Sequence, residues 1–206
     1  MSIYGVYGLP GAGKTTFLTY VAQRSLAGKG FLDIPAYKTV FTNFECSGCY
    51  KLDFDKLGVY DFHDCLILID EIMLLADCRD FKSFDNNKKY LFSNHRKHNT
   101  SIIYCSQGWD DVDRKIRILT TEYFLIENLW KFTIIKPIDR VMDAQGKMID
   151  RYQKAPFYKW KWIYRPKYYQ HFDSFNGRKL KPLEPEPWFP DLCDLCETGD
   201  CTGGEA

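Results

Sequence analysis

A glycine-rich segment near the amino terminus has the spacing of a phosphate-binding loop. Residues 8–15 read GLPGAGKT and match the pattern G-x-x-x-x-G-K-[ST] at every fixed position. An apolar strand-like run precedes the segment and a helix-like stretch follows it, as the motif requires. Backbone N–H groups of such a loop point at phosphate oxygens, and the helix start adds partial positive charge. The predicted nucleotide-binding residues are Gly8, Leu9, Pro10, Gly11, Ala12, Gly13, Lys14, Thr15 and Thr16.

Two carboxylates follow the apolar run CLILI, at Asp70 and Glu71. Ligands of open α/β sheets bind at the carboxyl ends of the strands, where these side chains would emerge. We expect Lys14 to reach the β- and γ-phosphates, and Thr15 and Asp70 to hold Mg²⁺. Glu71 would polarise the attacking water, which favours a hydrolase. The alternative is that the two carboxylates only cap the next helix.

Gln107 and three arginines are further candidates for roles in the chemistry. Gln107 follows the run SIIYCS and could sense the γ-phosphate or orient water by hydrogen bonding. The alternative is that it is only the polar residue that any strand end needs. A neighbouring subunit often supplies the last positive charge in phosphoryl transfer. Arg96, Arg114 and Arg117 are candidates for that arginine, and surface solvation is the competing role for each.

The elements that would position these residues alternate in type along the first 130 residues. Apolar, β-branched runs alternate with longer helix-like stretches, which predicts a parallel sheet flanked by helices. The predicted strands are Ile3–Tyr7, Thr39–Asn43, Cys65–Asp70, Ser101–Ser106 and Tyr123–Glu127, and the predicted helices are Lys14–Ala27 and Phe84–His98. After Trp130, short alternating runs around the turn DAQGK predict appended antiparallel hairpins.

Composition predicts a folded protein with segregated charge. The chain has 206 residues, enough for one mixed α/β domain, and its 45% hydrophobic content excludes wholesale disorder. Residues 131–181 hold 13 Lys/Arg against 4 Asp/Glu, whereas residues 182–206 hold none against 7. No signal-peptide pattern opens the chain, and no apolar run approaches the roughly 20 residues that cross a bilayer. We therefore expect a soluble cytoplasmic protein with a polyanion-facing or membrane-facing basic surface.

A basic, aromatic-rich segment lies between Arg151 and Phe175. It holds ten aromatic residues, interleaved with six cations. Single-stranded nucleic acid is bound through base stacking and phosphate attraction, which this composition could supply. The same alternation also suits a hairpin that packs its aromatic rings on the core and leaves its cations in solvent.

Eight cysteines include two C-x-x-C pairs, Cys46/Cys49 and Cys193/Cys196. Their local spacing is typical of zinc ligands, but unpaired thiols are the default in a reducing cytoplasm.

We predict an NTPase core over residues 1–136 and a basic, aromatic-rich β extension of the same domain over residues 137–181. An acidic, flexible tail is predicted over residues 182–206.

Six motifs together resemble a known family. GLPGAGKTT, KTVFTNF, LILIDE, SNHRKHNTSIIYCSQ, DVDRKIR and YYQHFDSF occur in the order found in the zonula occludens toxin-like (Zot) ATPases of filamentous-phage assembly. The resemblance spans Met1 to Phe175. It implies an α/β fold of the P-loop NTPase (RecA/ASCE-like) type, with a parallel sheet flanked by helices and an appended antiparallel β-hairpin region.

The family is related to the FtsK/HerA class of DNA-pumping ATPases, so the resemblance implies an ATP- and Mg²⁺-dependent motor. It assigns the catalytic base to Glu71 and the sensor to Gln107, and it places Arg114 and Arg117 in an arginine-bearing segment. The implied partners are single-stranded DNA, further copies of the chain in a ring, and phage coat or membrane assembly proteins.

Members of the family typically continue into a transmembrane helix, whereas this sequence ends in the acidic tail. We therefore expect the protein to act in the host cytoplasm, or at the inner face of the host membrane through a partner protein. Two other functions remain open. One is a nucleotide or nucleoside kinase, and the other is a nucleotide-dependent scaffold that binds coat or membrane proteins.

Overall fold

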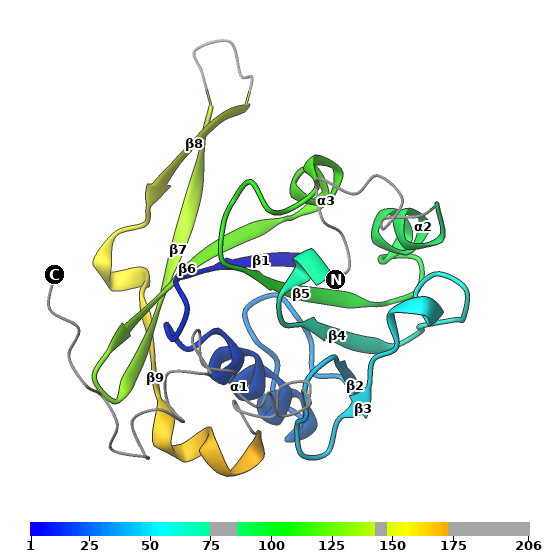
Figure 1. The fold of residues 1–206 in the computed structure, drawn as a ribbon, viewed down its shortest axis with the longest axis horizontal. Helices are drawn as coiled ribbons and strands as arrows, with labels where there is room; N and C mark the ends of the chain where they lie inside the picture. The colour runs from blue at the N-terminus through cyan, green and yellow to red at the C-terminus, as the bar shows by residue number, and fades with distance from the viewer. Residues whose placement is uncertain (75–85, 143–147, 173–206) are drawn as a thin grey trace, which may run out of the picture. The chain divides into compact units, whose positions relative to one another are not determined.

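A mixed nine-stranded sheet forms the centre of the fold, in the order β3-β2-β4-β5-β1-β6-β7-β8, with β9 paired to β7 (Figure 1). The computed structural model describes residues 1–74, 86–142 and 148–172. The strands are β1 Ile3–Tyr7, β2 Thr39–Thr42, β3 Tyr50–Lys51, β4 Cys65–Ile69, β5 Ser101–Ser106, β6 Glu122–Leu129, β7 Phe132–Met142, β8 Met148–Lys154 and β9 Lys161–Tyr164. Strands β1 to β6 pair in parallel, and β7 pairs antiparallel with β6, β8 and β9. The predicted α/β fold class is thereby confirmed.

Helices cover both faces of the sheet (Figure 1). The α-helices are α1 Lys14–Leu26, α2 Asn86–Asn94 and α3 Arg114–Leu119, and the short 3₁₀ helices are η1 Phe54–Lys56, η2 Ile72–Leu74, η3 Phe157–Lys159 and η4 Arg165–His171. Helix α1 packs through Phe17 and Val21 on one face. Helices α2 and α3 pack through Phe92 and Ile116 on the other. The central strands are therefore buried on both sides, as their continuous apolar runs require.

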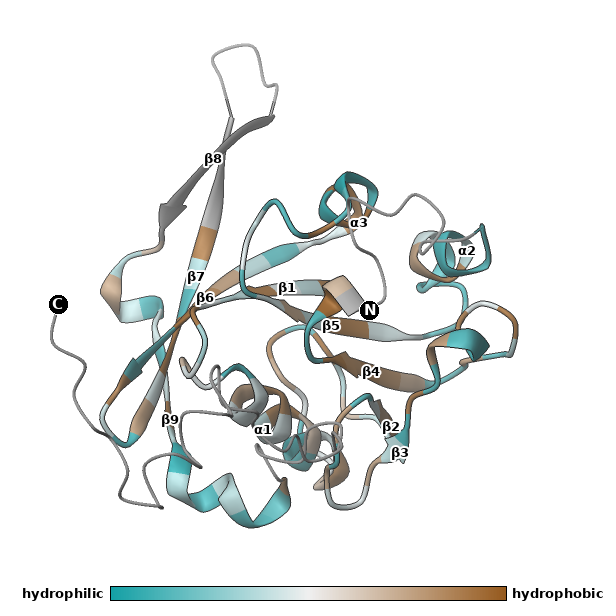
Figure 2. Cartoon of the chain, viewed as in Figure 1, coloured by the Kyte–Doolittle hydropathy of each residue, from teal (hydrophilic) through white to brown (hydrophobic). Residues whose placement is uncertain are grey.

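Hydropathy follows this arrangement (Figure 2). Strands β4 and β5 are predominantly apolar and fully buried, whereas the exposed sides of α2 and α3 carry hydrophilic residues. Among the described residues, no helix has both the length and the apolar content to cross a membrane.

Most predicted boundaries agree with the structure to within a residue or two. The second predicted helix differs, because α2 ends at Asn94 and the chain continues through turns to Asn99. The Nδ1 atom of His95 lies 2.8 Å from the carbonyl of Phe92, and Asn99 has a left-handed backbone (φ 49°). The His95 side chain thus contacts the last turn of α2, which ends about one turn earlier than predicted. Strand β3 and helix α3 were not predicted.

The compact unit Met1–Phe175 spans the predicted core, residues 1–136, and residues 137–175 of the predicted β extension, whose end at residue 181 stays a prediction. The boundary predicted at residue 136 falls inside β7, which pairs with β6 on one side and with β8 and β9 on the other. The predicted tail, residues 182–206, lies outside the described residues, so its flexibility stays a prediction.

Candidate functional site

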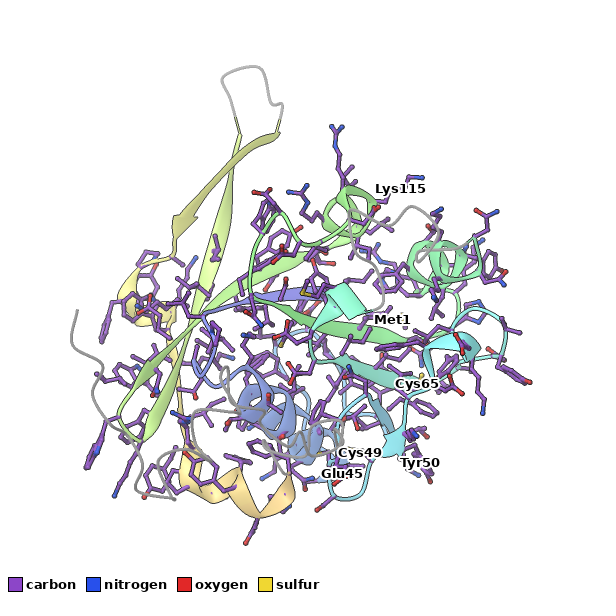
Figure 3. All side chains as sticks on the ribbon, viewed as in Figure 1. Met1, Glu45, Cys49, Tyr50, Cys65 and Lys115 are labelled. Carbon is purple, nitrogen blue, oxygen red and sulfur yellow. The ribbon has the colours of Figure 1, made fainter. Side chains whose placement is uncertain are left out.

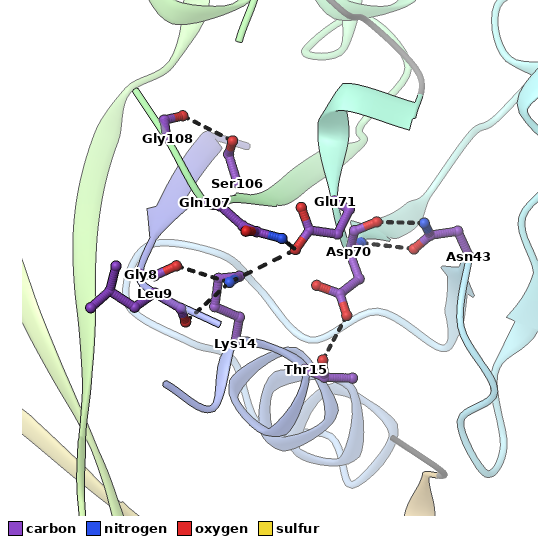
Figure 4. Close-up of polar contacts among 10 residues, drawn as sticks. All are labelled: Gly8, Leu9, Lys14, Thr15, Asn43, Asp70, Glu71, Ser106, Gln107 and Gly108. Carbon is purple, nitrogen blue, oxygen red and sulfur yellow. Dashed lines mark hydrogen bonds and ion pairs between the residues drawn. The ribbon is translucent and has the colours of Figure 1, made fainter. Parts of the chain in front are cut away.

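Three strand ends meet at one edge of the sheet (Figure 4). Strand β5 lies between β1 and β4, so Gln107 emerges between the phosphate loop and the acidic pair. The Gln107 Nε2 atom donates a hydrogen bond of 3.1 Å to Glu71 Oε1. Lys14 Nζ lies 3.8 Å from the same carboxylate oxygen. Three residues predicted from separate motifs, Lys14, Glu71 and Gln107, are thus brought together.

The phosphate loop presents unpaired donors at the start of α1. Gly13, the residue before the helix, has a left-handed backbone (φ 96°) and provides no side-chain cap. A Cβ atom at Gly13 would collide with the Thr133 side chain of β7, so glycine is required there. The first N–H groups of a helix have no partner within the helix. These groups can therefore bind phosphate oxygens.

Lys14 is buried and held against the loop itself. Its Nζ atom donates to the carbonyl oxygens of Gly8 at 2.9 Å and Leu9 at 3.4 Å. Of the predicted nucleotide-binding residues, Ala12 is buried in the core on the α1 face. Gly8, Leu9 and Ala12 therefore shape the loop, while the other predicted residues face a cleft.

That cleft has a volume of about 720 Å³ and contains the candidate catalytic groups. It is lined by Pro10, Gly11, Gly13, Lys14, Thr15, Thr16, Asp70, Glu71, Gln107, Arg165, Tyr169 and Phe172. The last three residues were not predicted as site residues. All three belong to the basic, aromatic-rich segment between Arg151 and Phe175. No local sequence pattern indicates that this segment lies beside the phosphate loop.

The Thr15–Asp70 pair fits a magnesium ion. Thr15 Oγ1 donates a hydrogen bond of 2.6 Å to Asp70 Oδ2. The other carboxylate oxygen, Oδ1, is buried and has no hydrogen-bond partner among the described residues. Burial raises the pKa of the Asp70 carboxyl above its usual range. Hydroxyl and carboxylate oxygens are ligands that Mg²⁺ prefers, and its charge would offset the cost of burying Asp70.

Asn43 is a positioning residue that was predicted only as a strand end. Its Nδ2 atom donates to the carbonyl of Asp70 at 2.6 Å, and its Oδ1 atom accepts from the Asp70 N–H at 2.7 Å (Figure 4). The next residue, Glu71, has a left-handed backbone (φ 59°), which is uncommon for a residue other than glycine. Asn43 therefore holds the chain where β4 ends and both carboxylates turn toward the loop.

In the part of the chain that the structure describes, the three arginines predicted for catalysis do not line the cleft. Arg96 lies in the turns before β5, near the amino end of that strand, whereas the phosphate loop follows the carboxyl end of β1. Arg114 begins α3, and Arg117 pairs with Asp110 at 3.7 Å and stacks on Trp109 at 5.3 Å. Their catalytic roles stay predictions that require a neighbouring subunit.

The Cys46/Cys49 pair lies in the chain between β2 and β3, where Gln23 of α1 contacts Cys46 Sγ at 3.9 Å and Cys49 is labelled in Figure 3. Both thiols are free and half-buried, and Cys193 and Cys196 lie outside the described residues, so a zinc site shared by the two pairs stays a prediction. Cys65 and Cys105 are buried in the core.

A separate group of possible metal ligands is formed by Asp61, His63 and His98, whose ligand atoms lie within 4.8 Å of one another. These residues lie around the start of β4, at the amino edge of the sheet. A metal bound there would be remote from the cleft.

Comparison with known proteins identifies the fold. No protein-family model matches the chain, and no curated protein matches it. The N-terminal domain of zonular occludens toxin from Neisseria meningitidis is similar in structure, with a TM-score of 0.56 and 16% identity over 84% of this chain and 98% of that domain. This chain has that fold. The P-loop NTPase fold implied by the sequence resemblance is thereby confirmed.

Two other solved structures show weaker similarity. The DNA-packaging ATPase from Sulfolobus turreted icosahedral virus has a TM-score of 0.48 and 9% identity, over 75% of this chain and 98% of that one. A KaiC-like protein from Pyrococcus horikoshii has a TM-score of 0.44 and 12% identity, over 75% and 89%.

The substitution Asn43→Ala tests how the acidic strand end is held. Loss of both side-chain bonds leaves the Asp70 N–H and carbonyl unpaired, so we expect the free energy of unfolding to fall by about 1–3 kcal/mol. Urea unfolding measures the change. Asn128→Ala, which alters an exposed asparagine of β6, is the matched control and should change stability by less than about 0.5 kcal/mol. Equal effects of the two substitutions would contradict the positioning role.

Proposed function

We propose that this protein is a Mg²⁺-dependent ATPase in which Glu71 is the general base. The observation that carries the proposal is the meeting of Lys14, Glu71 and Gln107 in one cleft beside the Thr15–Asp70 pair. Phosphoryl transfer depends on positioning and on stabilising charge that develops on the phosphate oxygens. These residues supply both requirements.

The two oxygens of Glu71 have different surroundings. Oε1 accepts from Gln107 and faces Lys14, while Oε2 is buried without a hydrogen-bond partner among the described residues. Oε2 therefore has unused acceptor capacity, and we assign to it the proton of the attacking water. In the proposed reaction, a water oxygen attacks the γ-phosphorus, the bond to the ADP oxygen breaks, and the water proton passes to Glu71.

Lys14 and the magnesium ligands serve the leaving phosphate groups. Lys14 lines the cleft, and its Nζ atom donates to two loop carbonyls, which hold its charge beside the site proposed for the phosphates. The bound Mg²⁺, held through Thr15 and Asp70, would supply positive charge against the phosphate oxygens. Gln107 holds the Glu71 carboxylate through Oε1 and thereby orients the base.

The substitution Glu71→Gln tests the proposed base. We expect the ATPase rate to fall by about 10²–10⁴-fold, because the amide cannot accept the water proton, while ATP binding is retained. Phosphate release and binding of labelled ATP are measured in parallel, and removal of Mg²⁺ with a chelator should abolish turnover. Glu45→Gln, at an exposed glutamate, is the matched control and should leave the rate unchanged.

Other outcomes identify the rival functions. Normal hydrolysis by Glu71→Gln would overturn the role given to Glu71. A phosphorylated small molecule as product would indicate a kinase. Wild-type protein that binds nucleotide without turnover, even with DNA added, would indicate a scaffold.

We further propose that ATP hydrolysis drives export or packaging of single-stranded DNA during phage or viral assembly. The shared fold with the zonular occludens toxin domain is consistent with this role. A ring of identical subunits, in which Arg96, Arg114 or Arg117 completes the neighbour's cleft, belongs to the same proposal. So do coat or membrane assembly proteins as partners, and the cytoplasmic face of the host membrane as the place of action.

An exposed aromatic surface supports a nucleic-acid partner. We define it by Trp130, Phe132, Phe157, Trp162 and Tyr164. Trp130 is 78% exposed and Phe157 66%, and Trp162 and Tyr164 are nearly half exposed. The ring centroid of Phe132 lies 6.2 Å from that of Trp162 and 5.5 Å from that of Tyr164, and Phe157 lies 6.4 Å from Trp162, so these four rings are contiguous.

Alternation along β9 decides which residues face outward. Ile163 is buried in the core on the α1 face, so its neighbours Trp162 and Tyr164 point to solvent. The core-packing interpretation of the segment is therefore wrong for these two rings. Lys131 Nζ lies 4.8 Å from the Trp130 ring centroid, and Lys159 is exposed on η3, the helix that carries Phe157. Stacking rings beside cations are what single-stranded DNA binds.

The double substitution Trp162→Ala/Tyr164→Ala tests this surface. Base stacking contributes about 1–3 kcal/mol per base, so affinity for a single-stranded oligonucleotide should fall at least about tenfold. Fluorescence anisotropy at two salt concentrations measures it, and wild-type affinity should decrease as salt rises. Tyr60→Ala, at a comparably exposed tyrosine outside this surface, is the control. Equal affinity of wild type and double variant would contradict the assignment.

A further inference from the structure

Helix η4 and the residue after it form one wall of the nucleotide cleft. Arg165 begins η4, Tyr169 lies one turn later, and Phe172 follows its end. All three side chains line the cleft that also contains Gly11, Gly13 and Thr16. We propose that Arg165 binds the phosphates of the nucleotide and that Tyr169 and Phe172 bind its base. This inference rests on the proposed triphosphatase function. It makes the wall formed by η4 and Phe172 a second surface that contacts the nucleotide, in addition to the phosphate loop.

The backbone of η4 is fixed at both ends. The Arg165 N–H donates to the Lys131 carbonyl at 2.9 Å, which ties the start of η4 to the turn between β6 and β7. The Ser47 N–H donates to the His171 carbonyl at 3.0 Å. Between these points the Tyr168 ring packs edge-on against Tyr20 of α1, with centroids 5.6 Å apart. The wall is therefore held in place before a nucleotide arrives.

Arg165 has unused hydrogen-bonding capacity. Its Nε atom is buried and has no partner among the described residues, and its guanidinium lies 5.9 Å from the Tyr169 ring centroid. A buried donor without an acceptor is unfavourable, and a guanidinium matches the geometry of phosphate oxygens. A triphosphate in the cleft would supply the missing acceptor. Arg165 would then add a positive charge from the same subunit to the one that Lys14 provides.

Tyr169 and Phe172 offer apolar ring surface at the same wall. Tyr169 is half exposed, and its ring centroid lies 6.4 Å from that of Phe172. Their neighbour Tyr168 is turned toward α1 and is not part of the cleft lining. A nucleotide whose phosphates contact the loop can place its base on these rings. Aromatic rings stack on any base, whereas bare phosphate has no base to stack. The two rings therefore favour a nucleotide over inorganic phosphate without selecting among bases.

Two ligands separate the two halves of the proposal. The full-length protein is titrated with the slowly hydrolysed analogue ATPγS and with inorganic tripolyphosphate, each with Mg²⁺, by calorimetry. Arg165→Ala should weaken the binding of both ligands about tenfold or more, because both carry the phosphates. Tyr169→Ala should weaken ATPγS binding several-fold and leave tripolyphosphate binding unchanged, because only the nucleotide has a base.

Matched variants serve as controls. Lys167→Ala removes an exposed cation of the same helix that does not line the cleft, and it should bind both ligands as wild type does. Arg165→Lys keeps the charge but not the planar fork and should recover part of the affinity. Thermal unfolding of each variant shows whether it is folded. If Arg165→Ala does not fold, Arg165→Lys and Arg165→Gln supply the comparison, and the glutamine variant should bind less tightly.

The outcomes that overturn this inference differ from those that overturn the proposed function. Wild-type affinity of the folded Arg165 variants for both ligands would remove the phosphate role. Equal loss of both ligands in Tyr169→Ala, or no loss, would remove the base role. In either case a wild-type protein that hydrolyses ATP through Glu71 would leave the proposed function intact. A wild-type protein that binds neither ligand would overturn both.

Discussion

The position of β5 between β1 and β4 is the constraint on which the candidate site depends. Parallel pairing sets Ile3 beside Ile102 and Leu66 beside Ser101, so the three strands end at the same edge of the sheet. Gln107 then lies between Lys14 and Glu71, and one carboxylate oxygen contacts both. If β1 and β4 were direct neighbours, Gln107 would emerge elsewhere and Glu71 would lose the donor that orients it. The buried apolar runs of these strands therefore fix the geometry of the polar groups that follow them.

The charged side chains that line the cleft favour the binding of ligands with complementary charge. Asp70 and Glu71 bring two carboxylates close to a single ammonium, Lys14, and each carboxylate has one buried oxygen without a hydrogen-bond partner among the described residues. Burial of unpaired charge is costly, so the arrangement favours a divalent cation at Asp70 and a proton donor, such as water, at Glu71. Arg165 adds the opposite requirement, because its buried Nε needs an acceptor. A magnesium–triphosphate complex with a bound water meets all three needs.

The sequence was sufficient for features encoded in contiguous residues. The phosphate loop, the buried strands and the polar residues at their ends follow from local patterns, so Lys14 and Glu71 could be predicted from them. Asn43 was visible only as a strand end, because its bonds to Asp70 depend on the pairing of β2 with β4. Arg165 reaches the cleft only because β9 pairs antiparallel with β7, and no local pattern encodes that contact. The face of β9 could not be predicted either, since a shift of one residue exchanges inward and outward side chains.

The same pairing gives two consecutive residues different surroundings. Tyr164 ends β9 on the exposed aromatic surface, and Arg165 begins η4 in the cleft. Their peptide link is held by the bond from the Arg165 N–H to Lys131, which lies in the turn that carries Trp130. A bound triphosphate would restrain Arg165 and, through one peptide unit, the end of the strand that carries Trp162. The surface proposed for DNA and the site proposed for ATP therefore share one backbone segment, so restraint at Arg165 has a short covalent path to the stacking rings.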